Sequence, residues 1–133
     1  MKRNHFLLLA GLLSLFFGIS MIVTPGQMLA NMTTIAAGGA SNAMRWLGAS
    51  LVAIGAINLF ARNDPGSEAL RAVMTGNIVL HVIAWGLDFL DYLNGIVRPS
   101  GIVTGSIVHL LLTVGFVYYL GRMGRQSQAS GTP

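Results

Sequence analysis

Charged residues are scarce in this chain of 133 residues, in which Asp, Glu, Lys and Arg together make up only 9%. An ordinary soluble domain contains about 25%, so the charge present here is too small to cover a globular surface. The scarcity argues against a soluble enzyme, a disordered chain and a nucleic-acid-binding protein. Cysteine is absent altogether, which excludes disulfide bonds, thiolate metal ligands and thiol catalysis.

Several enzyme motifs are missing as well. The chain contains no G-x-S-x-G, no Walker loop, no G-x-G-x-x-G and no HExxH. Hydrolase, nucleotide-driven and zinc-protease functions therefore lack motif support. Its histidines and acidic residues match no metal-site spacing either, and we expect neither a metal nor another cofactor.

Hydrophobic residues make up 53% of the chain and gather in four long segments. A helix of about 20 residues crosses the hydrocarbon core of a bilayer, and each segment is about that long. Backbone groups in lipid must be satisfied within the segment, and no segment alternates with period two, so helices are predicted. The predicted class is an all-α polytopic membrane protein, a four-transmembrane-helix bundle over residues 1–123. Its spans lie at about 6–24, 43–61, 70–92 and 101–120.

Basic residues indicate how these spans are oriented. Six of the eight flank one set of span ends and two flank the other set. Because cytoplasmic flanks carry the excess of Lys and Arg, we expect a multi-pass membrane protein with both termini cytoplasmic. The inner set is Lys2, Arg3, Arg62, Arg71, Arg122 and Arg125, and the outer set is Arg45 and Arg98.

The first apolar segment, the stretch between the first two spans and the C-terminal stretch each need a separate interpretation. Lys2 and Arg3 precede an apolar run, as in a signal peptide, but about 19 residues is long for one and no clean A-x-A site follows, so we expect a retained span. The stretch 25–44 is predicted to be a flexible loop or a short re-entrant turn. Residues 124–133 are polar and rich in Ser and Gly, which predicts a disordered cytoplasmic tail.

Small residues predict where the helices approach each other closely. Gly48 and Gly55 stand seven residues apart, nearly on one face of their span. Gly101 and Gly105 have the G-x-x-x-G spacing of a close crossing. We expect these glycines to serve packing within the four-helix unit rather than a specific dimer.

The third span carries a stripe of polar residues. At about 100° per residue, Asn77, His81, Asp88 and Asp91 fall within an arc of roughly 80°. A central Asp costs about 2.5 to 3.5 kcal/mol in lipid even on a lenient scale. The stripe is therefore predicted to face the bundle interior, a water-filled crevice or a partner subunit.

Two arginines are the candidate partners of the acidic residues in this stripe. Arg45 begins the second span near the depth of Asp88 and Asp91, and an ion pair with one of them is predicted because an unpaired buried charge is costly. Arg98 competes for Asp91. Such pairs either fix the helix register or form an acidic or zwitterionic ligand site near the outer interface.

Two histidines lie at similar depths near the bilayer middle, His81 in the third span and His109 in the fourth. They admit three uses. The plainest is a pair of neutral histidines that hydrogen-bond across helices to Asn58, Asn77 or Thr113. They can also relay protons or act as acid–base groups on an apolar substrate, or serve as axial ligands of a haem.

The candidate site combines these residues. Asn58 is expected to hydrogen-bond between helices, and Trp85 lies deep enough to line a pocket or simply to pack. The predicted ligand-binding residues are Arg45, Asn58, Asn77, Trp85, Asp91 and His109, and the predicted catalytic residues, if the protein is an enzyme, are His81 and Asp88.

A family resemblance accompanies these residue patterns. The sequence Arg45-Trp46-Leu47-Gly48 at the start of the second span, followed by His81, Asp88 and His109, resembles small bacterial four-helix membrane families. These include DoxX-like proteins and related families of unknown function. The resemblance implies a single four-helix module that acts as an accessory or redox-linked component of the inner, cytoplasmic membrane of a bacterium.

These observations favour a small membrane accessory or binding module for a hydrophobic ligand, either a lipid or a quinone, or for a larger membrane complex. One alternative is a membrane-embedded enzyme in which Asp88 and His81 act as acid and base on an isoprenoid-like or quinone-like substrate. A second is a small proton-coupled transporter that forms an oligomer. The expected partners are the lipid bilayer, a hydrophobic small molecule or membrane protein, and a second copy of the chain.

Overall fold

Five helices form the part of the chain that the computed structural model describes, namely residues 1–35, 38 and 40–130, with side chains through Gly124. All but the second are long and apolar enough to cross a membrane. The predicted all-α class with four transmembrane helices is confirmed. The helices are α1 (Arg3–Val23), α2 (Pro25–Met32), α3 (Ala40–Ala61), α4 (Glu68–Leu93) and α5 (Pro99–Ser130).

Local signals in the sequence explain where these helices begin and end. Pro25 occupies the first turn of α2, where its missing N–H costs nothing. Ser67 caps α4, because its hydroxyl accepts a hydrogen bond from the backbone N–H of Leu70. Gly66 and Gly95 adopt positive φ on either side of α4, at +128° and +72°, which suits glycine and ends the helical path.

Two segments outside the predicted spans can be compared with the sequence-based prediction. Within 25–44, predicted to be a flexible loop or a short re-entrant turn, residues Pro25–Met32 form the short helix α2, because a proline start and a run of helix formers precede Thr33. Residues 36, 37 and 39 lie outside the described residues. Helix α5 extends to Ser130, and the disordered tail predicted for residues 124–133 stays a prediction. Residues 131–133 lie outside the description.

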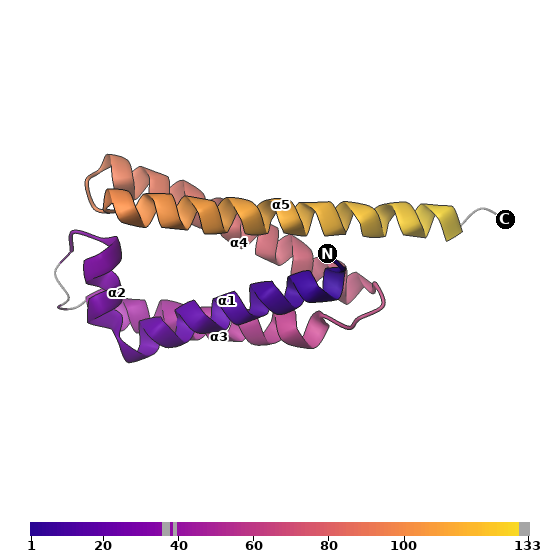
Figure 1. The fold of residues 1–133 in the computed structure, drawn as a ribbon, viewed down its shortest axis with the longest axis horizontal. Helices are drawn as coiled ribbons and strands as arrows, with labels where there is room; N and C mark the ends of the chain where they lie inside the picture. The colour runs from indigo at the N-terminus through magenta and orange to yellow at the C-terminus, as the bar shows by residue number, and fades with distance from the viewer. Residues whose placement is uncertain (36–37, 39, 131–133) are drawn as a thin grey trace.

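The four long helices form two antiparallel pairs (Figure 1). Helix α1 lies along α3, and α4 lies along α5, while contacts between the pairs are sparser. The end of the bundle that carries the N-terminus and the C-terminal part of α5 is called the terminal end below, and the opposite end is called the α2 end. Helix α2 crosses the α2 end beside both pairs (Figure 1).

Four glycines bring α1 and α3 together. A Cβ on Gly48 would stand 2.6 Å from the carbonyl oxygen of Gly18, and one on Gly55 would stand 2.9 Å from that of Gly11. Both neighbours are backbone atoms that cannot turn aside. The close crossing predicted from Gly48 and Gly55 therefore occurs, and its partner surface is the matching pair on α1. Such backbone contact is how helices pack where lipid removes the hydrophobic driving force.

The terminal end holds the packed core that joins the two pairs. Phe6 from α1 meets Phe116 edge-to-face at 4.8 Å between ring centroids and also contacts Tyr119. The hydroxyl of Tyr119 donates to the carbonyl of Met1 at 2.6 Å. The buried members of this core are Phe6, Leu7, Ala10, Leu70, Met74, Leu112, Phe116, Tyr119 and Met123.

Backbone bonds hold α2 against the loop between α4 and α5. Thr33 and Val97 form an isolated antiparallel bridge, and Arg98 donates its backbone N–H to the carbonyl of Met32 at 2.9 Å. Gly101 packs against the same segment, since a Cβ there would stand 2.6 Å from the carbonyl oxygen of Met32. The two helix pairs are thus tied together at both ends.

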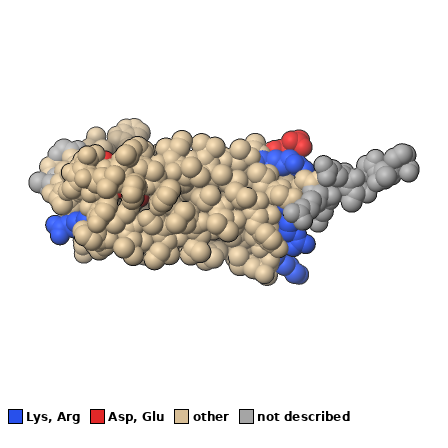
Figure 2. Space-filling view, turned by 90° about the horizontal axis from the view of Figure 1, so that it is seen from above, with Lys and Arg blue, Asp and Glu red and all other residues tan. Residues whose placement is uncertain are grey.

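Charged residues gather at the two ends of the molecule, and the broad middle of the face in Figure 2 is uncharged. The middle also exposes many large apolar side chains, among them Phe16, Leu111 and Val114, each at 66%. Large exposed apolar surface is costly in water and is expected against lipid. This distribution agrees with a multi-pass membrane protein.

A carboxylate organises the turn that leads into α4. Asp64 accepts hydrogen bonds from the backbone N–H groups of Ser67, at 2.8 Å, and Gly66, at 2.7 Å, and from the Ser67 hydroxyl at 2.8 Å. These bonds, those from the backbone N–H of Ser67 and then of Gly66 foremost, lower the pKa of Asp64. The bonded form of the turn is therefore the ionised one.

This arrangement predicts a pH dependence of stability. Because the pKa of Asp64 is lower in the folded state, its stabilising contribution is present at neutral pH and is lost as the pH falls from about 4 through the folded value. The Asp64→Asn variant should lack this loss, as measured by unfolding in mixed detergent micelles at pH 7 and at pH 3. Glu68→Gln, which removes a 93% exposed carboxylate beside Arg71, should keep it. Identical pH profiles for wild type and Asp64→Asn would contradict the assignment.

Candidate functional site

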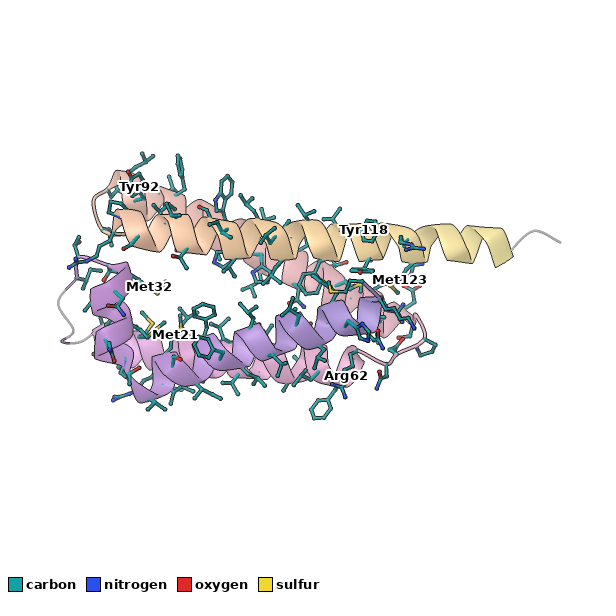
Figure 3. The ribbon with its side chains drawn as sticks, viewed as in Figure 1. Met21, Met32, Arg62, Tyr92, Tyr118 and Met123 are labelled. Carbon is teal, nitrogen blue, oxygen red and sulfur yellow. The ribbon has the colours of Figure 1, made fainter. Side chains whose placement is uncertain are left out.

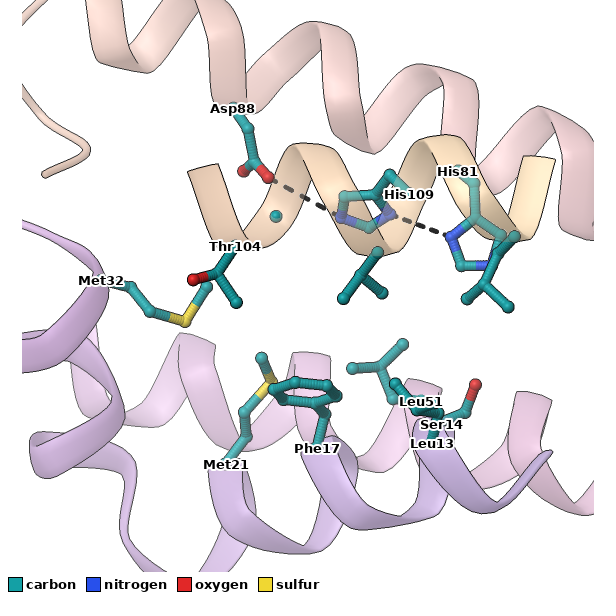
Figure 4. A pocket seen from close by; sticks show the side chains of 13 residues that line it. Leu13, Ser14, Phe17, Met21, Met32, Leu51, His81, Asp88, Thr104 and His109 are labelled. Atoms are coloured by element: carbon teal, nitrogen blue, oxygen red, sulfur yellow. Dashed lines mark hydrogen bonds and ion pairs between the residues drawn. The ribbon is translucent and has the colours of Figure 1, made fainter. Parts of the chain in front are cut away.

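A cavity lies between the α1–α3 pair and the α4–α5 pair, on the α2 side of the packed core (Figure 4). We call it the interhelical cavity, and its volume is about 100 Å³. Every helix contributes to its lining, so it exists only when both pairs are assembled. Its lining residues are Leu13, Ser14, Phe17, Met21, Met32, Leu51, His81, Asp88, Thr104, Gly105, Val108, His109 and Leu112.

One wall of the interhelical cavity carries three ionisable side chains in a row (Figure 4). Asp88 Oδ2 lies 3.7 Å from His109 Nε2, and His109 Nδ1 lies 2.9 Å from His81 Nδ1. His81 and Asp88 come from α4, and His109 comes from α5 between them. In the resulting Asp88–His109–His81 chain the two histidines are at hydrogen-bond distance and Asp88 lies just beyond it, so these polar groups face one another within the bundle.

Glycine and phenylalanine position the members of this chain. A Cβ on Gly105 would lie 2.8 Å from Asp88 Oδ2, so the absence of a side chain there makes room for the carboxylate. The imidazole of His81 stacks on the fully buried ring of Phe116, with 6.1 Å between centroids and an interplanar angle of 22°. Gly105 therefore leaves space for the carboxylate of Asp88, and the uncharged ring of Phe116 supports the imidazole of His81.

The opposite wall is almost entirely apolar. Leu13 and Phe17 of α1, Leu51 of α3 and two methionines face the polar chain across the cavity (Figure 4). Met21 and Met32 project into the space between the pairs near the α2 end (Figure 3). Flexible thioether side chains adapt to ligands of varied shape. A cavity with one polar wall and one apolar wall suits an amphipathic head group.

Asn58 and Asn77 form a second polar contact between the pairs. Each amide Nδ2 donates to the other's Oδ1 at 3.0 Å, and Asn77 also donates to the Val73 carbonyl at 2.8 Å. Asn58 is fully buried and Asn77 nearly so. The predicted helix-to-helix hydrogen bond of Asn58 is present, and this pair belongs to the structural join rather than to the cavity lining.

The amide pair predicts a measurable coupling. Asn58→Leu and Asn77→Leu should each destabilise the protein by about 1–2 kcal/mol, because each leaves a buried amide without its partner. The double variant should cost less than the sum, with a coupling of about 1 kcal/mol in a double-mutant cycle of unfolding. Strict additivity would show that the two amides do not depend on one another. Val82→Ala, at a half-exposed position of α4, serves as the additive control.

The predicted ion pairs with Arg45 and Arg98 are wrong among the residues that the structure describes. Arg45 Nε donates to the carbonyl of Ile22 at 3.4 Å, and Arg98 Nε donates to that of Thr33 at 2.7 Å. Each guanidinium thus sits at the carboxyl end of a helix, α1 or α2, where the unsatisfied carbonyls and the helix dipole attract a cation. Without α2 in the prediction, Arg98 had no such partner.

Two further predicted residues lie outside the interhelical cavity. Trp85 is 37% exposed, and its indole N–H donates to the Ser106 hydroxyl at 3.0 Å. Asp91 has no ion pair within the described part of the chain, and its backbone carbonyl accepts bonds from Ile96 and Val97 in the α4–α5 loop. Of the eight candidate site residues, the cavity brings together His81, Asp88 and His109.

Several lining residues were not singled out from the sequence as site residues. Ser14, Phe17 and Met21 of α1 line the cavity, and from Phe6 to Val23 this helix has no charged residue to mark that face. Gly105 was assigned to helix packing, whereas it faces Asp88. The usable signal was its spacing, since Gly105 and His109 are four residues apart and therefore share a face of α5.

The observed histidine pairing bears on the three uses foreseen for these residues. His81 and His109 bond to each other rather than to Asn58, Asn77 or Thr113. The distance of 2.9 Å between their Nδ1 atoms is that of a hydrogen bond. This geometry suits hydrogen bonding and proton relay between the two rings.

Comparison with known proteins leaves the function to be argued from this site alone. The resemblance to DoxX-like and related four-helix families stays a prediction. No protein-family model, no curated protein and no solved structure matches this chain.

Proposed function

We propose that this chain is a small integral membrane binding module that holds the head group of a hydrophobic ligand, a quinone or another ring-bearing lipid, in its interhelical cavity. One observation carries the proposal: the cavity places the Asp88–His109–His81 chain opposite an apolar wall. Ligand pockets are mostly apolar with a few convergent polar groups. The same combination here is matched to a ring that is apolar on its face and polar at its edge.

The dimensions of the cavity agree with a ring-sized head group. Engineered protein cavities of about 150 Å³ bind benzene, and this cavity of about 100 Å³ is of that order. The long tail of such a ligand would extend between the two helix pairs, whose mutual contacts are sparser than the contacts within each pair. Entry from the bilayer would then need no passage through water.

Native mass spectrometry with lipid identification tests the proposal. We expect a reproducible non-phospholipid ligand on protein purified in mild detergent. Leu13→Trp should reduce its occupancy at least about fivefold, because the indole fills the cavity that Leu13 lines. Leu12→Trp is the matched control, since Leu12 is 51% exposed on the adjoining lipid-facing surface. A ligand-free wild type, or equal occupancy in the two variants, would refute the proposal.

The orientation in the membrane is part of the proposal. Both the N-terminus and the end of α5 lie at the terminal end (Figure 1), and the basic residues of that end favour the cytoplasmic side of a bacterial inner membrane. Because the chain has no cysteine, single cysteines report orientation directly. Asn94→Cys, at the α2 end, should react with an impermeant maleimide in intact cells, and Asn63→Cys only after permeabilisation. The reverse pattern would invert the topology.

Acid–base catalysis on a quinone-like or isoprenoid-like substrate is the second candidate, favoured by the position of His109 between Asp88 and His81. In this case Asp88 and His81 act as the acid and base, and His109 carries protons between them. His109→Phe should then abolish turnover of the bound ligand while keeping measurable occupancy. A ligand recovered chemically unchanged after prolonged incubation with the wild type would count against catalysis.

A further inference from the structure

We infer that the interhelical cavity prefers a head group that carries a hydroxyl, as in a quinol or a phenol, over the same ring with a carbonyl in that place. The inference rests on the proposed function and names the chemistry of the ligand. It follows from the order of the protons along the Asp88–His109–His81 chain. Two polar atoms at the far end of that chain, without a hydrogen-bond partner among the described residues, also support it.

Proton order follows from what each group can carry. An ionised carboxylate only accepts hydrogen bonds, and a neutral imidazole has one N–H and one lone pair. Asp88 as a carboxylate, 3.7 Å from His109 Nε2, favours the tautomer of His109 with its proton on that nitrogen. His109 Nδ1 is then an acceptor, so the contact of 2.9 Å requires the proton to lie on His81 Nδ1. Only a lone pair is left on His81 Nε2.

The atoms at this end of the chain have room for a ligand. In the described part of the chain, His81 Nε2 and the Ser14 hydroxyl have no hydrogen-bond partner, and both residues line the interhelical cavity. Figure 4 places Ser14 on the α1 wall and His81 on the facing wall, at the same end of the cavity. Buried polar groups normally find partners, so these two predict a ligand atom between them.

A hydroxyl fits both groups, and a carbonyl fits only one. The O–H of a ligand can donate to His81 Nε2 while its oxygen accepts from the Ser14 hydroxyl. A carbonyl oxygen can accept from Ser14, but its lone pairs would face the lone pair of His81 Nε2. A polar site rejects an analogue that leaves its hydrogen bond unmade. Asp88 therefore sets the proton order, and His81 Nε2 is the atom that favours a ligand hydroxyl over a carbonyl.

A matched set of probes tests this inference on the full-length protein in nanodiscs. The probes are decylhydroquinone, kept reduced under anaerobic conditions, its oxidised quinone and its dimethyl ether, with affinities measured by fluorescence quenching. Decylhydroquinone should bind about tenfold more tightly than either analogue, the value of one well-made hydrogen bond. Equal affinities, or a preference for the quinone, would overturn the inference while leaving the binding-module proposal intact. Failure of all three to bind would overturn both.

Variants at two carboxylates identify the origin of the preference. Asp88→Asn should reduce the tenfold selectivity to less than about threefold, because the amide offers a donor as well as an acceptor and permits the opposite proton order. Asp91→Asn makes the same change at a carboxylate that does not line the cavity, and should keep the selectivity. Unchanged selectivity in Asp88→Asn, or its loss in Asp91→Asn, would show that Asp88 does not set the order.

Discussion

Gly48→Ala should destabilise the protein by about 2–3 kcal/mol, a large effect for the addition of one methyl group. The new Cβ would stand 2.6 Å from the carbonyl oxygen of Gly18 and 2.9 Å from Cβ of Met21. A side chain tip can move away, but the backbone of α1 cannot, so α1 and α3 must separate along part of their contact. Overpacking of a close-packed interface typically costs about 1–3 kcal/mol. The cost here lies in the upper part of that range because the new Cβ contacts backbone atoms. Unfolding in mixed micelles, followed by tryptophan fluorescence, measures the loss.

Gly86→Ala is the matched control for this prediction. Gly86 lies within α4 in open space, where an added Cβ would have no heavy atom within 4 Å beyond its own helix backbone and chain neighbours. Alanine is the better helix former by about 1 kcal/mol, so Gly86→Ala should be neutral or stabilising. Gly18→Ala should resemble Gly48→Ala, because its Cβ meets the carbonyl of Gly48 at 2.7 Å. Equal changes in stability for Gly48→Ala and Gly86→Ala would show that helix propensity, and not the contact between α1 and α3, determines the effect.

The spans and one half of this glycine contact could be predicted from the sequence. The length of an apolar segment and the seven-residue spacing of Gly48 and Gly55 are properties of one segment, so they can be recognised from the sequence alone. Their partners, Gly11 and Gly18, have the same spacing, but the choice of which helices pair depends on the assembled bundle. Helix α2 was missed because eight residues are too few for a periodic pattern to be distinguished from a loop.

Site residues that share a face of one helix could be predicted from the sequence. Contacts that depend on how two helices pack could not. The arc of Asn77, His81 and Asp88 turns inward because a single helix places them on one face. The facing of His81 and His109 agreed with their similar depths. The partners of Arg45 and Arg98 were not predictable from depth, since carbonyls at helix ends compete with carboxylates for a guanidinium, and every helix end offers them. The apolar wall carried no chemical signal to distinguish it from packing residues.

Gly105→Ala should weaken ligand binding about tenfold while leaving the stability within about 0.5 kcal/mol of the wild type. The added Cβ would lie 2.8 Å from Asp88 Oδ2 and no closer than 3.8 Å to any other heavy atom outside its own backbone neighbours. The atom it meets is the end of a flexible side chain, which can rotate away at little cost. The substitution therefore separates the carboxylate from His109 without altering any polar group of the site.

The expected consequence is a loss of proton order rather than of fold. Once Asp88 moves away from His109, neither tautomer of His109 is favoured, and His81 no longer presents a fixed lone pair to the cavity. Imidazole ¹⁵N chemical shifts should then indicate a mixture of tautomers at His81 and His109, whereas the wild type and the Gly86→Ala control should each show one. Decylhydroquinone affinity should fall in parallel. A Gly105→Ala protein that keeps single tautomers and full affinity would mean that Asp88 neither orders the histidines nor contributes to the site. A variant that unfolds would instead place Gly105 among the packing glycines, with Gly48 and Gly55.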